Sequence, residues 1–258
     1  MKNIIGIIPA RMSSSRLPNK PMADILGMPM IGHVYFRSKM STILNEVYVA
    51  TCDKEIADYV ANIGGKSIMT ADSHERASDR TAEALLTIEK ETGNKVDIVV
   101  MIQGDEPMIT PEMISAAVTP LLNEPDLNIT NLMEYMATVE EHEDPAEVKV
   151  IVDRLQNAIY FSREPIPSRK KGVSNVPMLK QVCIIPFRRD FLIDYNGMEQ
   201  TPLEIIESVD MNRLIENNIP IRMVLREEET FSVDTQSDLD KVIRLMSVDD
   251  LTKRYLKQ

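Results

Sequence analysis

The chain opens with an apolar run, Ile4 to Ile8, that is broken only by Gly6 and ends at Pro9. A β-branched run of this length predicts a strand buried in a parallel sheet. Similar runs recur at 47–51 and 96–102, and a further short strand is expected at 66–69. The apolar positions follow helical spacing over 29–40, 54–62 and 79–92. This alternation of strands and helices predicts an α/β fold with a doubly wound parallel sheet.

The second half of the chain has a less regular pattern. It predicts strands at 147–152, 181–186 and 221–225, a strand followed by a turn over 157–167, and a polar, mobile loop over 168–177. One amphipathic helix is expected over 201–217, another helix over 238–246, and a polar tail after it. We interpret residues 1–258 as a single domain that contains a smaller lobe at about 145–200.

The composition narrows the classes of function. A net charge of −11 argues against binding to nucleic acid or to a membrane surface by the protein as a whole. No apolar stretch approaches the ~20 residues of a membrane span. Cys52 and Cys183 show neither a metal-ligand spacing nor a disulfide framework. We therefore expect a cytoplasmic protein in which any site for a polyanion is a local basic pocket.

Cations gather in the loop that follows the first strand. Arg11, Arg16 and Lys20 lie there with Ser13, Ser14 and Ser15, and the loop contains no acid. Ligands of open α/β sheets bind at the carboxyl ends of strands, and this mixture of cations and hydroxyls suits a polyphosphate. The alternative is an ordinary solvated loop.

Two aspartates are candidate ligands for Mg²⁺, which takes a few carboxylates together with substrate phosphates. Asp105 follows the strand at 96–102, and Asp234 precedes the helix at 238–246. A turn with solvated acids is the alternative for Asp105, and a helix cap is the alternative for Asp234.

Arg163 lies in a rigid turn before Glu164-Pro165, where it could hold a carboxylate with two hydrogen bonds or form a surface ion pair with Glu164. His33, His74 and His142 stand alone without a nucleophile, and His33 is expected to be a packed helix residue. No GxGxxG or P-loop pattern is present, which argues against dinucleotide-binding and kinase-type functions.

Five segments in order resemble the CMP-Kdo synthetases, the cytidylyltransferases that activate 3-deoxy-manno-octulosonate (Kdo). They are IPARMSSSRLPNKP, QGDEPMI, EVKVIVD with AIYFSREPIP, TPLEIIE and VDTQSDLDKV, and the colinear match covers almost the whole chain, from Ile4 to about Met246. The resemblance implies a three-layer α/β/α fold of the nucleotide-diphospho-sugar transferase type with a mostly parallel, mixed sheet, a small dimerisation lobe and a homodimer. It also implies a Mg²⁺-dependent transfer of CMP from CTP to a 2-keto-3-deoxy sugar acid, as in lipopolysaccharide biosynthesis.

The resemblance also assigns roles to individual positions. Arg16, Lys20 and Asp105 would be catalytic, and Asp105 and Asp234 would hold the metal ion. The nucleotide would be bound by Pro9, Ala10, Arg11, Ser15, Arg16, Lys20, Ser78, Arg80 and Gln103. The sugar would be bound by Gln103, Arg163, Gln181, Glu204 and Glu207. Two other functions stay open: transfer to a sugar phosphate or phosphonate, and non-catalytic nucleotide binding by a regulatory protein.

One segment, 180–187, departs from the family pattern. Gln181 stands where the family has a histidine that faces the sugar, and Ile185 and Phe187 stand where it has tyrosines. Fewer hydrogen bonds to a polyhydroxylated sugar predict that Kdo is a poor substrate or not the best one, and that a related acid with a modified tail does better. The alternative is that these positions only pack, with Gln181 replacing the imidazole as a donor.

Overall fold

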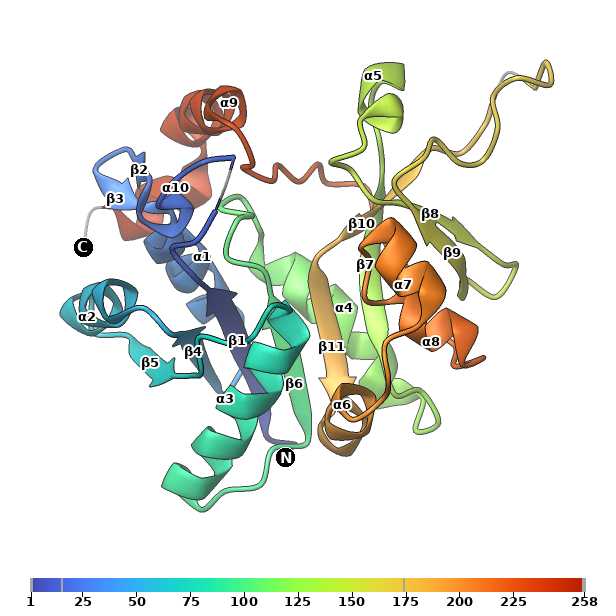
Figure 1. Cartoon of the computed structure of the whole chain (residues 1–258). Helices are drawn as coiled ribbons and strands as arrows, with labels where there is room; N and C mark the ends of the chain where they lie inside the picture. Colours follow the sequence, from blue (N-terminus) through green and yellow to red (C-terminus); the bar gives the residue numbers. More distant parts are fainter. Residues whose placement is uncertain (1, 15, 174, 257–258) are drawn as a thin grey trace. The chain divides into compact units, whose positions relative to one another are not determined.

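A computed structural model of the chain describes residues 2–14, 16–173 and 175–256. The chain divides into two compact units (Figure 1). The first comprises residues 1–115 together with 230–258, and the second comprises residues 116–229. The lobe that the sequence placed at about 145–200 lies within the second unit.

The first unit is built on parallel strands, as the apolar runs predicted. Its central strand, β1 (Ile4–Ala10), pairs in parallel with β4 (Glu46–Thr51) on one side and β6 (Ile98–Ile102) on the other. β5 (Lys66–Met69) continues the sheet beyond β4. Ile7 and Ile8 are fully buried in β1, as expected for a strand covered on both faces.

The order of these strands determines where the unit can bind a ligand. Because the chain moves from β1 to β4 and β5 on one side and then crosses to β6 on the other, the strand order reverses beside β1. Open α/β sheets bind their ligands at such a reversal, outside the carboxyl ends of the strands. The loops that begin after Ala10 and after Ile102 leave from this place.

Helices cover the sheet of the first unit, with α3 in front of it and α1 behind it in Figure 1. α3 ends at Gly93, which takes a left-handed conformation (φ 70°) that suits glycine. The helical and short elements of this unit are η1 (Lys20–Met22), β2 (Asp24–Ile25), β3 (Met28–Pro29), α1 (Met30–Lys39), α2 (Lys54–Asn62), α3 (Ala77–Thr92), the start of α4 (Pro111–Asn123), α9 (Gln236–Val248) and α10 (Asp250–Tyr255).

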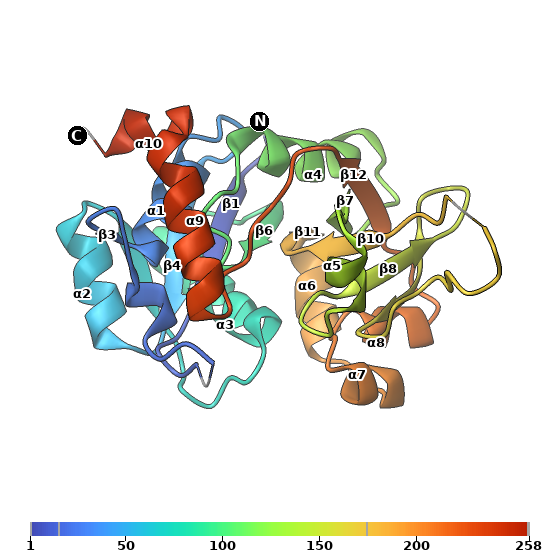
Figure 2. The same ribbon diagram turned by 90° about the horizontal axis from the view of Figure 1, so that it is seen from above.

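The expected polar tail is wrong, because residues 250–255 form α10, which lies beside α1 (Figure 2). Tyr255 is 3% exposed, and its hydroxyl lies 2.7 Å from Nδ1 of His33. His33 Nε2 lies 2.8 Å from the carbonyl of Ile25, so Nε2 carries the proton and Nδ1 accepts from the tyrosine. Arg37 Nε also donates to Tyr255 at 3.2 Å. His33 is thus the packed helix residue that the sequence indicated.

The second unit contains a mixed sheet in the order β12-β7-β10-β8-β9. β10 is antiparallel to both β7 and β8, whereas β12 runs parallel to β7. Its strands are β7 (Thr130–Tyr135), β8 (Lys149–Val152), β9 (Ala158–Ser162), β10 (Leu179–Val182), β11 (Ile184–Arg188) and β12 (Arg222–Arg226). Its helices, besides the end of α4, are α5 (Val139–Glu143), α6 (Arg189–Asn196), α7 (Pro202–Glu207) and α8 (Asn212–Glu216).

The single helix expected over 201–217 is wrong, since α7 and α8 are separate. The break lies at Ser208, whose φ of 52° is left-handed and ends α7. Glu204 on α7 and Arg213 on α8 form a bidentate ion pair with distances of 2.6 and 2.7 Å. Turning the chain at Ser208 therefore folds the two short helices onto a shared buried contact. No helix among the described residues is long and apolar enough to cross a bilayer.

Candidate functional site

Both aspartates that the sequence suggested as metal ligands contact the same lysine in the first unit. Nζ of Lys20 lies 2.8 Å from Oδ2 of Asp105 and 2.8 Å from Oδ1 of Asp234. Arg16 also contacts Asp234 Oδ1, through Nη2 at 3.1 Å. These four residues come from three distant segments of the chain, so the fold brings together the charges that the sequence singled out separately.

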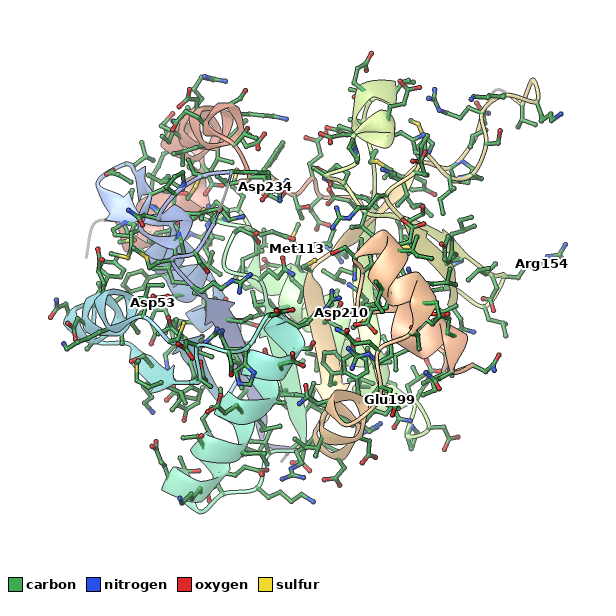
Figure 3. The ribbon with its side chains drawn as sticks, in the orientation of Figure 1. Asp53, Met113, Arg154, Glu199, Asp210 and Asp234 are labelled. Carbon is green, nitrogen blue, oxygen red and sulfur yellow. The ribbon has the colours of Figure 1, made fainter. Side chains whose placement is uncertain are left out.

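Backbone contacts hold the two aspartates in place. Asp105 follows the carboxyl end of β6, and its carbonyl accepts a hydrogen bond of 2.9 Å from the backbone N–H of Val233. Asp234, labelled in Figure 3, comes next in the chain and precedes α9. Thr235 is the N-cap of α9 and forms a capping box with Asp238, so the cap role considered for Asp234 belongs to its neighbour.

The charges of the cluster shift the pKa of Lys20. Burial alone lowers it, but the adjacent carboxylates of Asp105 and Asp234 outweigh burial and raise the pKa above its ordinary value. The side chain is only 14% exposed. Lys20 is therefore a charged ammonium at neutral pH.

The donor set suits a hard divalent cation. Oδ1 of Asp105 is buried and accepts no hydrogen bond from any described residue. An uncompensated buried carboxylate oxygen is costly, and coordination of a cation would relieve that cost. The described residues contain no group of three or more His, Cys, Asp or Glu side chains placed to hold a metal ion. Few protein ligands are typical of Mg²⁺, which completes its shell with water and phosphate oxygens.

Two cations of the loop, Arg11 and Arg16, are exposed to solvent. Pro9 and Ala10 are the last residues of β1, and Ala10 is buried. Arg11 is exposed, and its Nη1 donates to the carbonyl of His74 over a long 3.4 Å. Arg16 has a side chain that is 56% exposed. Ser15 lies outside the described residues.

Three further nucleotide-side candidates lie in the first unit. Gln103 is half-buried directly after β6, beside Asp105 in the sequence. Ser78 and Arg80 belong to the first turn of α3, and both are buried. Nη1 of Arg80 donates to Thr70 Oγ1 and Ala71 O, whereas its buried Nη2 has no hydrogen-bond partner among the described residues. Arg80 therefore retains an unsatisfied cationic donor.

Asp53 supports the loop, although the sequence reasoning did not identify it as a site residue. It is labelled at the start of α2 in Figure 3, and its Oδ2 accepts a hydrogen bond of 2.8 Å from the backbone N–H of Met12. Since this amide lies next to Arg11, Asp53 fixes the backbone where the loop leaves β1. Its position just after β4, the neighbour of β1, was the available signal.

In the second unit, Arg163 and Glu207 form the centre of a polar network. The carboxylate of Glu207 accepts hydrogen bonds from Tyr160 Oη (2.8 Å), Ser162 Oγ (2.8 Å) and Arg163 N (2.9 Å). These bonds outweigh burial and lower the pKa of Glu207, while burial and the Glu207 charge raise the pKa of Tyr160 to about 12. Glu207 is therefore ionised and Tyr160 protonated at neutral pH.

The guanidinium of Arg163 lies against backbone carbonyls. Nε donates to Glu207 O and Nη1 to Pro145 O, each at 2.9 Å, and longer contacts of 3.4 Å reach Ala146 O and Ser208 O. These contacts fix its plane. In this conformation the Arg163 side chain links the surrounding loops through hydrogen bonds to their carbonyls. To bind a carboxylate with two hydrogen bonds, it would have to give up some of these carbonyl contacts.

Lys149 is a second support that the sequence reasoning missed. It is fully buried, and its Nζ donates to the carbonyls of Asp144, Glu147 and Arg163. Burial lowers its pKa. The only signal for it was a lysine inside an apolar strand pattern, where a charge must find partners.

The structure separates the other sugar-side candidates into packed and accessible positions. Glu204 is fully buried with both oxygens on Arg213, so this conformation does not present its carboxylate to a sugar. Ile185 and Phe187 are 1% and 0% exposed, and Phe187 stacks on Tyr195. Gln181 is half-buried, with Nε2 donating to Asn131 Oδ1 at 2.6 Å. Of the three positions that differ from the family pattern, Ile185 and Phe187 pack in the core, whereas Gln181 is partly exposed.

Comparison with curated proteins identifies relatives along nearly the whole chain. A 3-deoxy-manno-octulosonate cytidylyltransferase from Geobacter metallireducens is 38% identical over 254 residues, covering 95% of this chain and 98% of the relative. The corresponding protein from Fusobacterium nucleatum is 40% identical over 247 residues, covering 96% and 98%.

Solved structures agree with this match. A CMP:2-keto-3-deoxy-manno-octonic acid synthetase complexed with CTP aligns with a TM-score of 0.86 at 38% identity, covering 95% of this chain and 99% of that protein. A cytidylyltransferase from Leptospira borgpetersenii aligns with a TM-score of 0.64 at 17% identity, covering 96% and 88%, which shows a shared fold. The cytidylyltransferase family model matches residues 5–249. The chain therefore belongs to the cytidylyltransferase family, together with the 3-deoxy-manno-octulosonate cytidylyltransferases.

Proposed function

We propose that this protein transfers CMP from CTP to the anomeric hydroxyl of a 2-keto-3-deoxy sugar acid and releases pyrophosphate. The observation that carries the proposal is the 38–40% identity to 3-deoxy-manno-octulosonate cytidylyltransferases over almost the full length of both chains. The convergence of Lys20, Asp105 and Asp234 supports it, because the relatives' reaction needs fixed charges around a triphosphate. Kdo is the first acceptor to test. We also expect the reaction to take place in the cytoplasm, where CTP is available.

In the proposed reaction, the sugar hydroxyl oxygen forms a bond to the α-phosphorus of CTP and its proton passes to solvent. The bond from that phosphorus to the leaving pyrophosphate breaks. Positioning and charge neutralisation supply most of the catalysis in such transfers. Arg11, Arg16 and Lys20 lie on the loop after β1 and would bind the triphosphate oxygens. The unsatisfied Nη2 of Arg80 is a further donor for the nucleotide.

Asp105 and Asp234 would hold Mg²⁺. When bound, the ion would supply Lewis-acid stabilisation of negative charge on the phosphate oxygens. The role of the two carboxylates is to present hard oxygen ligands at a fixed point after β6 and before α9. Gln103, which comes two residues before Asp105, would contact the nucleotide or the sugar.

The sugar acid would be bound in the second unit. Glu207 fixes the Tyr160-Phe161-Ser162-Arg163 segment through three hydrogen bonds, and Lys149 adds a hydrogen bond to the Arg163 carbonyl. We assign Arg163 to the sugar carboxylate, after exchange of its carbonyl contacts, and Gln181 to a sugar hydroxyl. Glu204 would support this region through its ion pair and not by direct contact.

Pyrophosphate release with each nucleotide and a panel of acceptors would test the proposal. We expect turnover with CTP and Kdo or a related 2-keto-3-deoxy acid, with UTP as the nearest competitor and ATP and GTP poor, because a pocket that hydrogen-bonds a base edge leaves its partners unpaired with the wrong base. Equal use of ATP, turnover only with sugar phosphates or phosphonates, or nucleotide binding without any turnover would each contradict the assignment.

The acceptor preference should depend on Gln181. Because Ile185 and Phe187 are buried, Gln181→Ala is expected to raise KM for the preferred sugar acid by roughly tenfold, the loss expected for one buried hydrogen bond, with KM for CTP unchanged. Steady-state kinetics would measure both constants. Gln200→Ala, at an exposed position of the same unit, is the matched control. An unchanged KM in Gln181→Ala would show that position 181 only packs.

We further propose that the protein is a homodimer that associates through the second unit. Three isoleucines of this unit are largely exposed: Ile159 (52%), Ile205 (59%) and Ile206 (74%). Exposed aliphatic side chains of this size are commonly covered by a partner. Light scattering at micromolar concentration should give twice the chain mass of 29.2 kDa, and Ile206→Asp with Ile159→Asp should reduce it. A monomer mass for the wild-type protein would contradict the proposal.

A further inference from the structure

We propose that Lys20 competes with a divalent cation for the Asp105–Asp234 pair, so that the protein binds the cation tightly only after a nucleoside triphosphate has drawn the ammonium away. The inference rests on the proposed function and concerns how metal and nucleotide binding depend on each other. It makes Lys20 a residue that controls entry to the aspartate pair as well as a ligand of the triphosphate.

The first support is the bridging geometry. Nζ of Lys20 lies at the same short distance, 2.8 Å, from one oxygen of each aspartate. Such charge-assisted bonds are about twice as strong as neutral hydrogen bonds. An ammonium is also a compact point charge, so it neutralises the facing carboxylates at the place where a small cation would do so. The ammonium therefore occupies the place between the two carboxylates that a divalent cation shared by them would need.

The second support is the charge balance of the cluster. With Lys20 bound between them, the two carboxylates already have one full cation, and Arg16 adds a partly exposed one at 3.1 Å from Asp234. A divalent cation that entered beside the ammonium would bring like charges into contact in a site that is only about one-fifth exposed, where repulsion is strong. Cation binding therefore requires Lys20 to leave.

The third support is that Lys20 can leave. It lies in η1, just after the exposed residues Pro18 and Asn19, and its flexible four-carbon side chain can turn without moving the aspartates, which are held by the Val233–Asp105 backbone bond. A triphosphate bound on the loop after β1 offers Lys20 a replacement anion. Buried Oδ1 of Asp105, which has no hydrogen-bond partner among the described residues, gives the arriving cation a ligand that the ammonium does not use.

The binding of the cation and the binding of the triphosphate are thermodynamically linked, so the competition by Lys20 has a measurable effect on both affinities. If the triphosphate raises the affinity for the cation, then the cation must raise the affinity for the triphosphate by the same factor. Removing the ammonium should tighten cation binding in the absence of nucleotide and reduce this mutual enhancement. Removing a lysine charge elsewhere on the surface should change neither the cation affinity nor the mutual enhancement.

Mn²⁺ binding, measured by calorimetry and by the electron paramagnetic resonance signal of free Mn²⁺, is the direct test. Without nucleotide, Lys20→Met is expected to bind Mn²⁺ roughly tenfold or more tightly than wild type, which is the ratio that corresponds to one lost hydrogen bond to a charged group. Lys54→Met removes the same charge from an exposed lysine of the first unit and should leave Mn²⁺ affinity unchanged. Adding Asp105→Asn to Lys20→Met should abolish the gain.

The second measurement uses the unaltered protein. CTP affinity is measured with and without Mn²⁺ and in the absence of any acceptor, so no turnover is involved. Wild type should show mutual enhancement, and Lys20→Met should show less of it. Lys20→Gln serves as a second variant, and thermal melts confirm that each variant is folded.

Two results would overturn the inference. One is wild-type binding of Mn²⁺ that is equally tight with and without CTP. The other is a folded Lys20→Met or Lys20→Gln that binds Mn²⁺ no better than wild type does. In either case, wild-type turnover with CTP and a sugar acid would still support the proposed function. Conversely, strong mutual enhancement of Mn²⁺ and CTP binding without any turnover would support the competition between Lys20 and the cation and would reject the proposed function.

Discussion

Asp105→Asn is expected to lower turnover with CTP by about a thousandfold or more while leaving the fold intact. The amide keeps the shape of the side chain and one acceptor oxygen, but it removes the charge that a hard cation needs and that Lys20 neutralises. A loss of several kcal/mol of charge stabilisation corresponds to a rate effect of this order. Pyrophosphate release as a function of Mg²⁺ concentration would measure both the rate and the metal response.

The matched control for this prediction is Asp58→Asn. Asp58 lies on α2 in the same unit, is 58% exposed and forms an ion pair with Lys54 at 2.5 Å. Exposed pairs of this kind contribute little, so we expect normal turnover and an unchanged melting temperature. If Asp105→Asn kept the wild-type rate and the same Mg²⁺ dependence, Asp105 could not be a metal ligand.

Arg213→Leu is expected to destabilise the second unit by about 3–5 kcal/mol, the usual cost of leaving a buried charge without its partner. Glu204 is fully buried, and both its oxygens lie on the Arg213 guanidinium. The hydrogen bonds to Glu204 raise the pKa of Arg213, so its guanidinium stays charged in the folded protein. The substitution also removes the packing of this guanidinium on Tyr195, at 4.8 Å from the ring centroid.

Thermal unfolding should show this loss as a decrease on the order of 10 °C in the transition that contains the second unit. Two further variants separate the charge effect from the loss of packing. Glu204→Leu combined with Arg213→Leu should recover part of the stability, because no unpaired charge remains. Arg222→Leu, which breaks a more exposed pair with Glu124, should cost about 1 kcal/mol or less. Equal melting temperatures for Arg213→Leu and wild type would show that the pair contributes nothing.

The first unit was predictable because its signals are local. β1, β4 and β6 are short apolar runs, and α2 and β5 begin and end at the residues predicted from the sequence, 54–62 and 66–69. The cations after β1 and Asp105 after β6 could be identified because parallel strands direct their carboxyl ends to one edge. The contact of Lys20 with both aspartates could not be predicted from the sequence, since Asp234 lies 214 residues from Lys20.

The secondary structure of the second unit was harder to predict because its strands and helices depend on contacts with residues far away in the sequence. β7 lies between β12 and β10, so Asn131 and Glu134 are buried although they are polar, and this hides the strand pattern. Asn131 is satisfied by Val182 O and Gln181 Nε2, both about fifty residues away in the sequence. The helix expected over 201–217 followed real amphipathic spacing, but the pairing of Glu204 with Arg213 favours a turn at Ser208 that no local pattern shows.

Discontinuity of the first unit has a consequence for the order in which a ribosome can build this protein. Residues 1–115 leave the ribosome before the second unit, whereas Val233, Leu239 and Val242, which complete the core beside Leu17 and Ile25, leave it after the second unit. The second unit is contiguous and can close its own hydrogen bonds while synthesis continues. The nascent segment Arg16–Lys20 can therefore meet Asp105 early, but it must wait for Asp234 until the second unit has been synthesised.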